Sequence, residues 1–131
     1  MVVLVLVIYK ILRLDMNDTP LEDVESTMFA QYLQALQLQK KVLDYTHTAN
    51  ETYTKSWGTK MKNKRMGVTK GIPDFIIVTK KVLVFIEMKR VKGGVISPEQ
   101  KSWIESLKKV GQVAEITKGF DEAKVVIDKY I

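Results

Sequence analysis

An apolar stretch near the middle of the chain, KGIPDFIIVTKKVLVFIEMKR (residues 70–90), carries an Asp at one end and a Glu-x-Lys at the other. Asp74 lies just before the first apolar run, and Glu87 and Lys89 lie near the end of the second. Burying a charge is costly unless another group pairs with it. These residues therefore occupy solvent-exposed positions at the end of a sheet, or they form a site.

The two apolar runs predict a β-hairpin because a short polar turn separates them. A turn centred between residues 80 and 81 places Asp74 opposite Glu87, and the alternation of side chains puts Lys89 on the same face as Glu87. Two adjacent carboxylates stay ionised together only with positive charge between them. Lys89 supplies one charge, and a divalent metal ion would supply the rest. The alternative is a plain salt bridge of Lys89 at an exposed sheet end. A register shift of one residue would separate the two acids.

Composition narrows the kinds of site that are possible. The 131 residues fit one domain, residues 1–131, with a real core. The absence of cysteine excludes disulfides and thiolate metal sites, and the single histidine, His47, excludes a structural zinc site. Any metal would be a hard cation bound by oxygen atoms, such as Mg²⁺ or Mn²⁺.

Positive charge is concentrated in the middle of the chain. The formal net charge is +6, and residues 55–92 hold eleven Lys or Arg residues but two acids, Asp74 and Glu87. This distribution favours a nucleic-acid partner. A solvated lysine surface is the alternative.

The N-terminal apolar run is too short for a membrane span, which needs about 20 residues. It also lacks the features of a signal peptide. We expect a cytoplasmic protein in which residues 2–9 form a β-strand, within an N-terminal extension over residues 1–16.

The remaining elements follow from periodicity and capping signals. A capping box at residues 19–22 opens a helix to about residue 40, and a second box, Ser97-Pro98-Glu99-Gln100, opens another helix that ends before Gly111. Further strands are expected over residues 42–49 and 112–117, a long basic loop over residues 50–71, and a last helix that Asp121 caps.

The first helix carries an acid on its apolar face. Glu25 is three residues before Met28 and four before Phe29, which belong to the apolar stripe of this helix. An acid on a buried face needs a partner. The alternative is a partly exposed glutamate at a frayed helix end.

These motifs together resemble one nuclease family. GIPD, the apolar hairpin, FIEMKR and GGVISPEQKSWIESL occur in the order typical of the VRR-NUC family of the PD-(D/E)xK nuclease superfamily, in its stand-alone phage-type form. The resemblance extends through HTANET and GFDEAKVVIDKYI and covers residues 20–131. It implies an α/β fold with an αβββαβ core, a central mixed sheet flanked by helices. The strand over residues 2–9 would be an addition to this core.

The resemblance also implies roles for particular residues. Asp74 and Glu87 would bind the metal ion, with Glu25 as a third ligand and Glu22 as its alternative. Lys89 would orient the attacking water or stabilise charge on the phosphate.

Two further matches are implied near the site. Gln100 matches a glutamine near the family's active site, although it also completes the capping box, and the two roles are compatible. Asn50 and Glu51 match an Asn-Glu pair of the family.

The implied activity is that of a Mg²⁺- or Mn²⁺-dependent deoxyribonuclease. We expect a structure-selective endonuclease that acts as a homodimer on branched DNA such as Holliday junctions. Tyr53 and Trp57 would stack on unpaired bases, unless they pack the loop onto the core. The alternatives are a non-catalytic nucleic-acid-binding module, or flap or exonuclease activity. The basic residues expected to contact DNA are Lys55, Lys60, Lys62, Lys64, Arg65, Lys70, Arg90 and Lys92.

Overall fold

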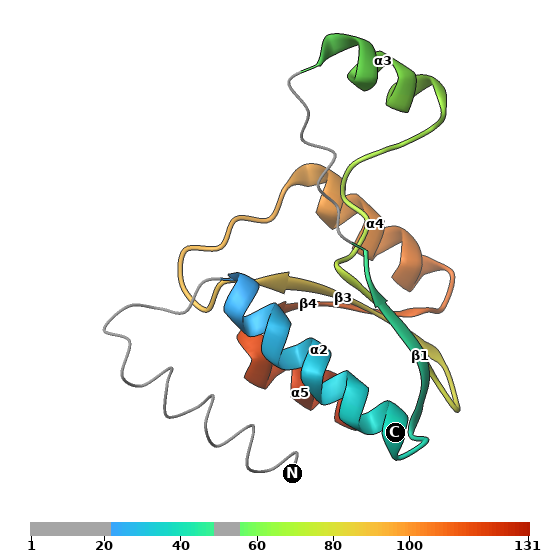
Figure 1. The fold of residues 1–131 in the computed structure, drawn as a ribbon, viewed down its shortest axis with the longest axis vertical. Helices are drawn as coiled ribbons and strands as arrows, with labels where there is room; N and C mark the ends of the chain where they lie inside the picture. Colours follow the sequence, from blue (N-terminus) through green and yellow to red (C-terminus); the bar gives the residue numbers. More distant parts are fainter. Residues whose placement is uncertain (1–21, 49–55) are drawn as a thin grey trace.

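The architecture is a mixed four-stranded sheet with helices on both faces (Figure 1). The computed structural model describes residues 22–48 and 56–131. The sheet order is β1-β2-β3-β4, in which β1, β2 and β3 pair antiparallel and β4 pairs parallel to β3. This arrangement confirms the predicted fold class. The strands are Val42–His47, Phe75–Thr79, Leu83–Lys89 and Val113–Lys118.

Two helices cover one face of the sheet and a third covers the other. Helices α2 (Glu22–Leu38) and α5 (Gly119–Asp128) lie side by side under the sheet, and α4 (Pro98–Lys109) lies above it (Figure 1). Among the described residues, no helix is both long enough and apolar enough to cross a membrane.

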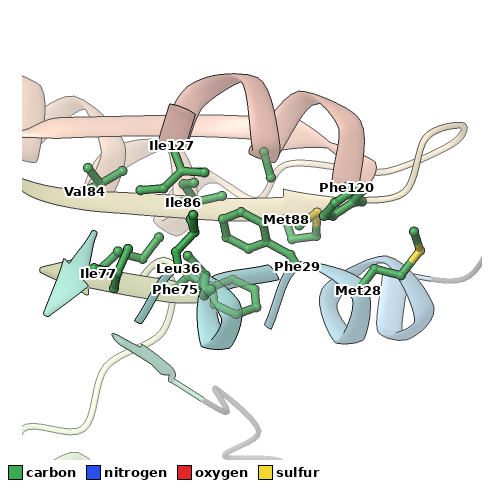
Figure 2. Packing of buried hydrophobic residues seen from close by; sticks show 13 residues of the cluster. Met28, Phe29, Leu36, Phe75, Ile77, Val84, Ile86, Met88, Phe120 and Ile127 are labelled. Atoms are coloured by element: carbon green, nitrogen blue, oxygen red, sulfur yellow. The ribbon is translucent and has the colours of Figure 1, made fainter. Parts of the chain in front are cut away.

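The core lies between the sheet and the pair α2 and α5 (Figure 2). Strand β2 alternates buried and half-buried side chains, as its period of two predicts. The rings of Phe29 on α2 and Phe75 on β2 meet edge to face with centroids 5.0 Å apart. This packing holds the start of β2, and therefore the preceding Asp74, in a fixed place.

The hairpin register agrees with the prediction. Phe75 pairs with Ile86 and Val78 with Leu83. One further step in the same register brings Asp74 opposite Glu87. The two acids therefore meet at one end of the sheet, next to the last residues of β3.

The prediction of a continuous loop over residues 50–71 was wrong. Helix α3 (Trp57–Arg65) forms within it, capped by Ser56, whose hydroxyl accepts a hydrogen bond from the Thr59 amide at 3.2 Å. None of its residues is buried, and it projects away from the sheet (Figure 1). Because α3 buries no face, its sequence has no apolar period by which to recognise it.

The start of the last helix was also misplaced. Helix α5 begins at Gly119, with Lys118 rather than Asp121 at the N-cap. The carboxylate of Glu122 accepts a hydrogen bond from the Lys118 amide at 2.9 Å, which satisfies one of the free amides at this end. Asp121 lies in the first turn, where its charge favours the helix dipole.

Several predicted features lie outside the described residues. They are the strand over residues 2–9, the N-terminal capping box, Asn50, Glu51, Tyr53 and Lys55.

Candidate active site

Asp74 and Glu87 form an acidic pair at the end of the hairpin. Asp74 is anchored by the Met88 amide, which donates a hydrogen bond to its Oδ2 at 2.8 Å. Glu87, on the opposing strand, is 1% exposed. The two carboxyl groups are close enough for Glu87 to affect the pKa of Asp74. The predicted meeting of these two acids is therefore present.

Lys89 and Gln100 converge on one oxygen of Glu87. The Lys89 ammonium lies 3.5 Å from Glu87 Oε1, and Gln100 Nε2 donates to the same atom at 2.7 Å. Lys89 is 9% exposed. Glu87 is thus compensated by one cation and one amide, as a buried carboxylate requires.

Gln100 performs both of the roles that the sequence left open. The side-chain Oε1 of Gln100 accepts a hydrogen bond from the Ser97 backbone amide at 3.0 Å. The backbone amide of Gln100 donates to the Ser97 hydroxyl at 3.1 Å, which completes the capping box. The other end of the same side chain holds Glu87. One residue therefore fixes both the start of α4 and an acid of the site.

Burial raises the pKa of Asp74 above its ordinary value. The Met88 amide, His47, Lys89 and the interaction with Glu87 lower that pKa and oppose the effect. The net rise means that the surrounding protein disfavours the Asp74 charge when no other cation is present.

Glu25 is buried, as the spacing on α2 predicted. Its carboxylate lies against the start of α5: a Cβ at Gly119 would be 2.9 Å from Glu25 Oε1. Among the described residues, however, no three Asp, Glu or His side chains form a group able to hold a metal ion. The structure brings Asp74 and Glu87 together but does not add Glu25 to them. The Glu22 side chain is not described.

The acidic pair fits a hard divalent cation. Mg²⁺ is usually bound by one or two carboxylates and completes its shell with water and substrate phosphates. Asp74 and Glu87 supply two carboxylates from the hairpin, and burial raises the pKa of Asp74, so that a bound cation would stabilise its charged form. The donor set therefore suits Mg²⁺ or Mn²⁺ better than a softer metal.

A glycine lets the basic segment pass close to α4. Gly71 has φ +94°, and a Cβ there would lie 2.5 Å from the carbonyl carbon of Glu99. Nearby, the Trp103 indole donates to the Lys70 carbonyl at 3.2 Å. The base of the segment that carries α3 is therefore packed against the helix end that holds Gln100.

The predicted DNA-contacting residues that are described are all exposed. Trp57 is 74% exposed and contributes nothing to the core, so the alternative of core packing fails for this residue. The exposed basic residues are Lys60, Lys62, Lys64, Arg65, Lys70, Arg90 and Lys92.

Sequence reasoning missed His47. It pairs with Phe75 across β1 and β2, and its ring stacks on the Phe75 ring with centroids 4.6 Å apart. It also lies close enough to Asp74 to lower the pKa of that carboxyl group. The available signal was the strand alternation, which places Tyr45 and His47 on one side of β1.

Comparisons with known proteins agree with this geometry. The model of the VRR-NUC domain matches residues 15–121. A solved structure described as a VRR_NUC domain protein is similar, with a TM-score of 0.50 and 28% identity over 79% of this chain and 88% of that chain. A comparison with curated proteins found no match.

The family match includes every element of the candidate site. Such a domain implies nuclease-type activity, with DNA as the partner and a general dependence on metal. Since the match spans most of the sequence, the chain belongs to the VRR-NUC family.

Proposed function

We propose that this protein is a Mg²⁺- or Mn²⁺-dependent, structure-selective endonuclease that hydrolyses phosphodiester bonds in branched DNA such as Holliday junctions. The observation that carries the proposal is the cluster of Asp74, Glu87, Lys89 and Gln100 at one end of the sheet, in which Glu87 and Lys89 are buried and Asp74 and Gln100 are half-buried. Four polar side chains fixed in a nuclease-family core are better explained by catalysis than by stability, because buried ion pairs contribute little to stability.

The side chains of the candidate site would have different roles in hydrolysis. Asp74 and Glu87 would hold the metal ion, which, when bound, polarises the phosphoryl group and lowers the pKa of a water molecule. The Lys89 ammonium provides fixed positive charge beside the pair, where it stabilises negative charge that develops on the phosphate. Gln100 fixes the orientation of the Glu87 carboxylate. Glu25 remains our candidate for a third acidic group.

Helix α3 would contact the DNA backbone. Its last turn carries Lys62, Lys64 and Arg65, and it has no acid in its first turn. Contacts between such side chains and phosphates do not depend on base sequence and weaken steeply with salt. The exposed Trp57 ring is suited to stacking on an unpaired base at a branch point.

We further propose a homodimer in the cytoplasm, or in the host cytoplasm if a phage encodes the protein. A four-way junction presents two equivalent strands to be cut. A two-fold dimer places one site at each of them.

The test is a panel of branched, flapped and linear DNAs, each incubated with Mg²⁺ or Mn²⁺. We expect cutting of branched DNA that is lost in Lys89→Ala and in Asp74→Ala, while DNA binding persists. Lys81→Ala, at the opposite end of the hairpin, is the matched control and should cut normally.

Each other outcome has a definite meaning. Robust metal-dependent cutting by both site variants would refute the assignment. Binding of the wild type without any cutting would favour the non-catalytic module, and cutting only at flaps or free ends would favour the flap or exonuclease alternative.

A further inference from the structure

A cavity lined mainly by polar residues lies between α2 and the edge strand β1, outside the acidic pair. Its volume is about 360 Å³. Asp23 is the one acid among the described residues that line it, and none of these residues is Lys or Arg. The neutral polar side chains are Ser26, Thr27, Gln31, Gln34, Tyr45 and His47.

The His47 wall of the cavity lies at the same end of the sheet as the acidic pair. His47, on its wall, is the ladder partner of Phe75, the residue after Asp74. The next residue, Thr48, ties the two segments together: its amide donates to the Asp74 carbonyl at 2.7 Å and its hydroxyl to the Pro73 carbonyl at 2.9 Å. The His47 wall of the cavity and the Asp74 backbone therefore lie next to each other along the chain pairing of β1 and β2.

The ring of His47 is held as a flat platform. It lies nearly parallel to the Phe75 ring, at 15° with centroids 4.6 Å apart. Phe75 is fully buried and is itself fixed by an edge-to-face contact with Phe29. His47 is nevertheless exposed, so its outer face is open to a ligand. An exposed flat ring with a fixed inner face is suited to stacking on a base.

The lining indicates the chemical class of the ligand. A phosphate group would need cations, and in a chain with net charge +6 this cavity has none among its described residues. The amide of Gln34 offers a donor and an acceptor side by side, as base edges require. The volume is at the lower end of the range for small-ligand sites, about 300–1,000 Å³, which suits one nucleobase.

We propose that this cavity binds a single unpaired nucleobase of the DNA strand near the scissile phosphate. The base stacks on His47, and the amide of Gln34 contacts its edge. The inference rests on the proposed action on DNA and adds a means of selecting branched substrates, since a base can enter the cavity only where it is unpaired. Duplex DNA would have to lose a stacked base pair first.

The experiment pairs a protein change with a DNA change and reads binding without cutting. Branched DNAs with one abasic nucleotide, scanned across positions near the branch, are titrated in EDTA and followed by fluorescence anisotropy. We expect one position at which removing the base weakens binding by the wild type about five- to a hundredfold. His47→Ala should bind intact DNA with a similar loss and should lose nothing further with the abasic DNA.

Three variants separate stacking from other effects. His47→Phe keeps a flat ring without the ring nitrogens and should retain the response to the abasic position. Gln34→Ala changes an exposed side chain, should therefore fold normally, and should reduce that response. Thr46→Ala is the control, because this neighbour is exposed, pairs with Ile76 and does not line the cavity.

The proposal is overturned if no abasic position affects wild-type binding, or if His47→Phe loses the response in the way that His47→Ala does. Because binding is measured without metal, failure here is distinct from failure of the nuclease assignment. A clear base effect without cutting in Mg²⁺ would support the cavity and refute the enzyme, and cutting without a base effect would do the reverse.

Discussion

Gln100 both caps helix α4 and contacts Glu87 of the candidate site, and Gln100→Ala tests the importance of these two contacts. The substitution removes the bond to the Ser97 amide and the bond to Glu87 Oε1. The first is a neutral helix-capping contact. The second is made to a carboxylate that is 1% exposed, so water cannot easily replace it.

The expected loss of stability follows from these two bonds. A neutral hydrogen bond contributes about 0.5–1.5 kcal/mol, and one to a charged group about 1.5–3 kcal/mol. We therefore expect Gln100→Ala to lower the free energy of unfolding by about 2–4 kcal/mol. Ser97→Ala removes the other half of the capping box without touching Glu87, and should cost about 1 kcal/mol.

Urea unfolding followed by circular dichroism, with and without Mn²⁺, separates the two roles of Gln100. A metal ion that binds the folded state stabilises it in proportion to its affinity. Because Gln100 orients Glu87, Gln100→Ala should gain less stability from Mn²⁺ than the wild type gains. Ser97→Ala should gain as much as the wild type.

One result would refute the reasoning. If Gln100→Ala and Ser97→Ala have the same unfolding midpoint and the same gain from Mn²⁺, Gln100 acts only as a helix cap. Its contact with Glu87 would then contribute neither to stability nor to metal binding.

Four further predictions concern other features of the molecule. Gly71→Ala should destabilise the protein by more than about 2 kcal/mol, because alanine at this positive φ is strained and its Cβ would also clash with the Glu99 backbone. Gly93→Ala, with φ +74° and no atom within 4 Å, should cost only the strain, about 1–2 kcal/mol. Urea unfolding midpoints distinguish the two variants. Burial raises the pKa of Asp74, so the folded state favours the protonated form and loses stability as pH rises through that pKa. Asp74→Asn should therefore stabilise the metal-free protein at pH 7 and abolish cleavage. A variant that is destabilised in thermal melts would contradict this reasoning. Wild-type Mn²⁺ affinity, measured by calorimetry, should rise over the same pH range, because a carboxyl group must lose its proton to bind the ion. Replacing the four cations of α3 by alanine should reduce the slope of the log binding constant against log salt by about 3–4, at roughly 0.9 per phosphate contact. An equal reduction on replacing four cations at the far end of the sheet would refute the assignment of DNA contacts to α3. The α3 set is Lys60, Lys62, Lys64 and Arg65, and the control set is Lys40, Lys41, Lys80 and Lys81.

The hairpin could be predicted from sequence because two independent constraints agree on it. The short turn defines which residues are opposite each other, and the alternation of apolar residues defines which face is buried. Together they place Asp74 against Glu87 without knowledge of any other element. The capping box of α4 was equally local, since Ser97 and Gln100 are three residues apart.

Features without a local apolar pattern, or that depend on contacts distant in sequence, could not be predicted in this way. Helix α3 buries nothing, so no apolar pattern records it. The contact between Gln100 and Glu87 joins a helix to a strand and depends on how α4 packs on the sheet. The stacking of His47 likewise requires the pairing of β1 with β2, which the sequence of β1 does not specify.

Glu25 shows that burial of an acid does not by itself place it beside the other candidate metal ligands. Helical spacing placed it inside the protein, and it is inside. Its carboxylate, however, lies against Gly119 at the start of α5. Gly119 directly follows Lys118, the last residue of β4, which pairs with Lys89 on β3.

Glu25 therefore approaches the sheet end from the β4 side, whereas Asp74 approaches it from the β2 side, with β3 between them. Any cation held by the acidic pair meets Glu25 only if it binds toward β4. Water and phosphate oxygens can complete the shell of a hard cation without a third acid. The register of the β2–β3 hairpin, rather than the helix, is thus the part of the fold that assembles the candidate site.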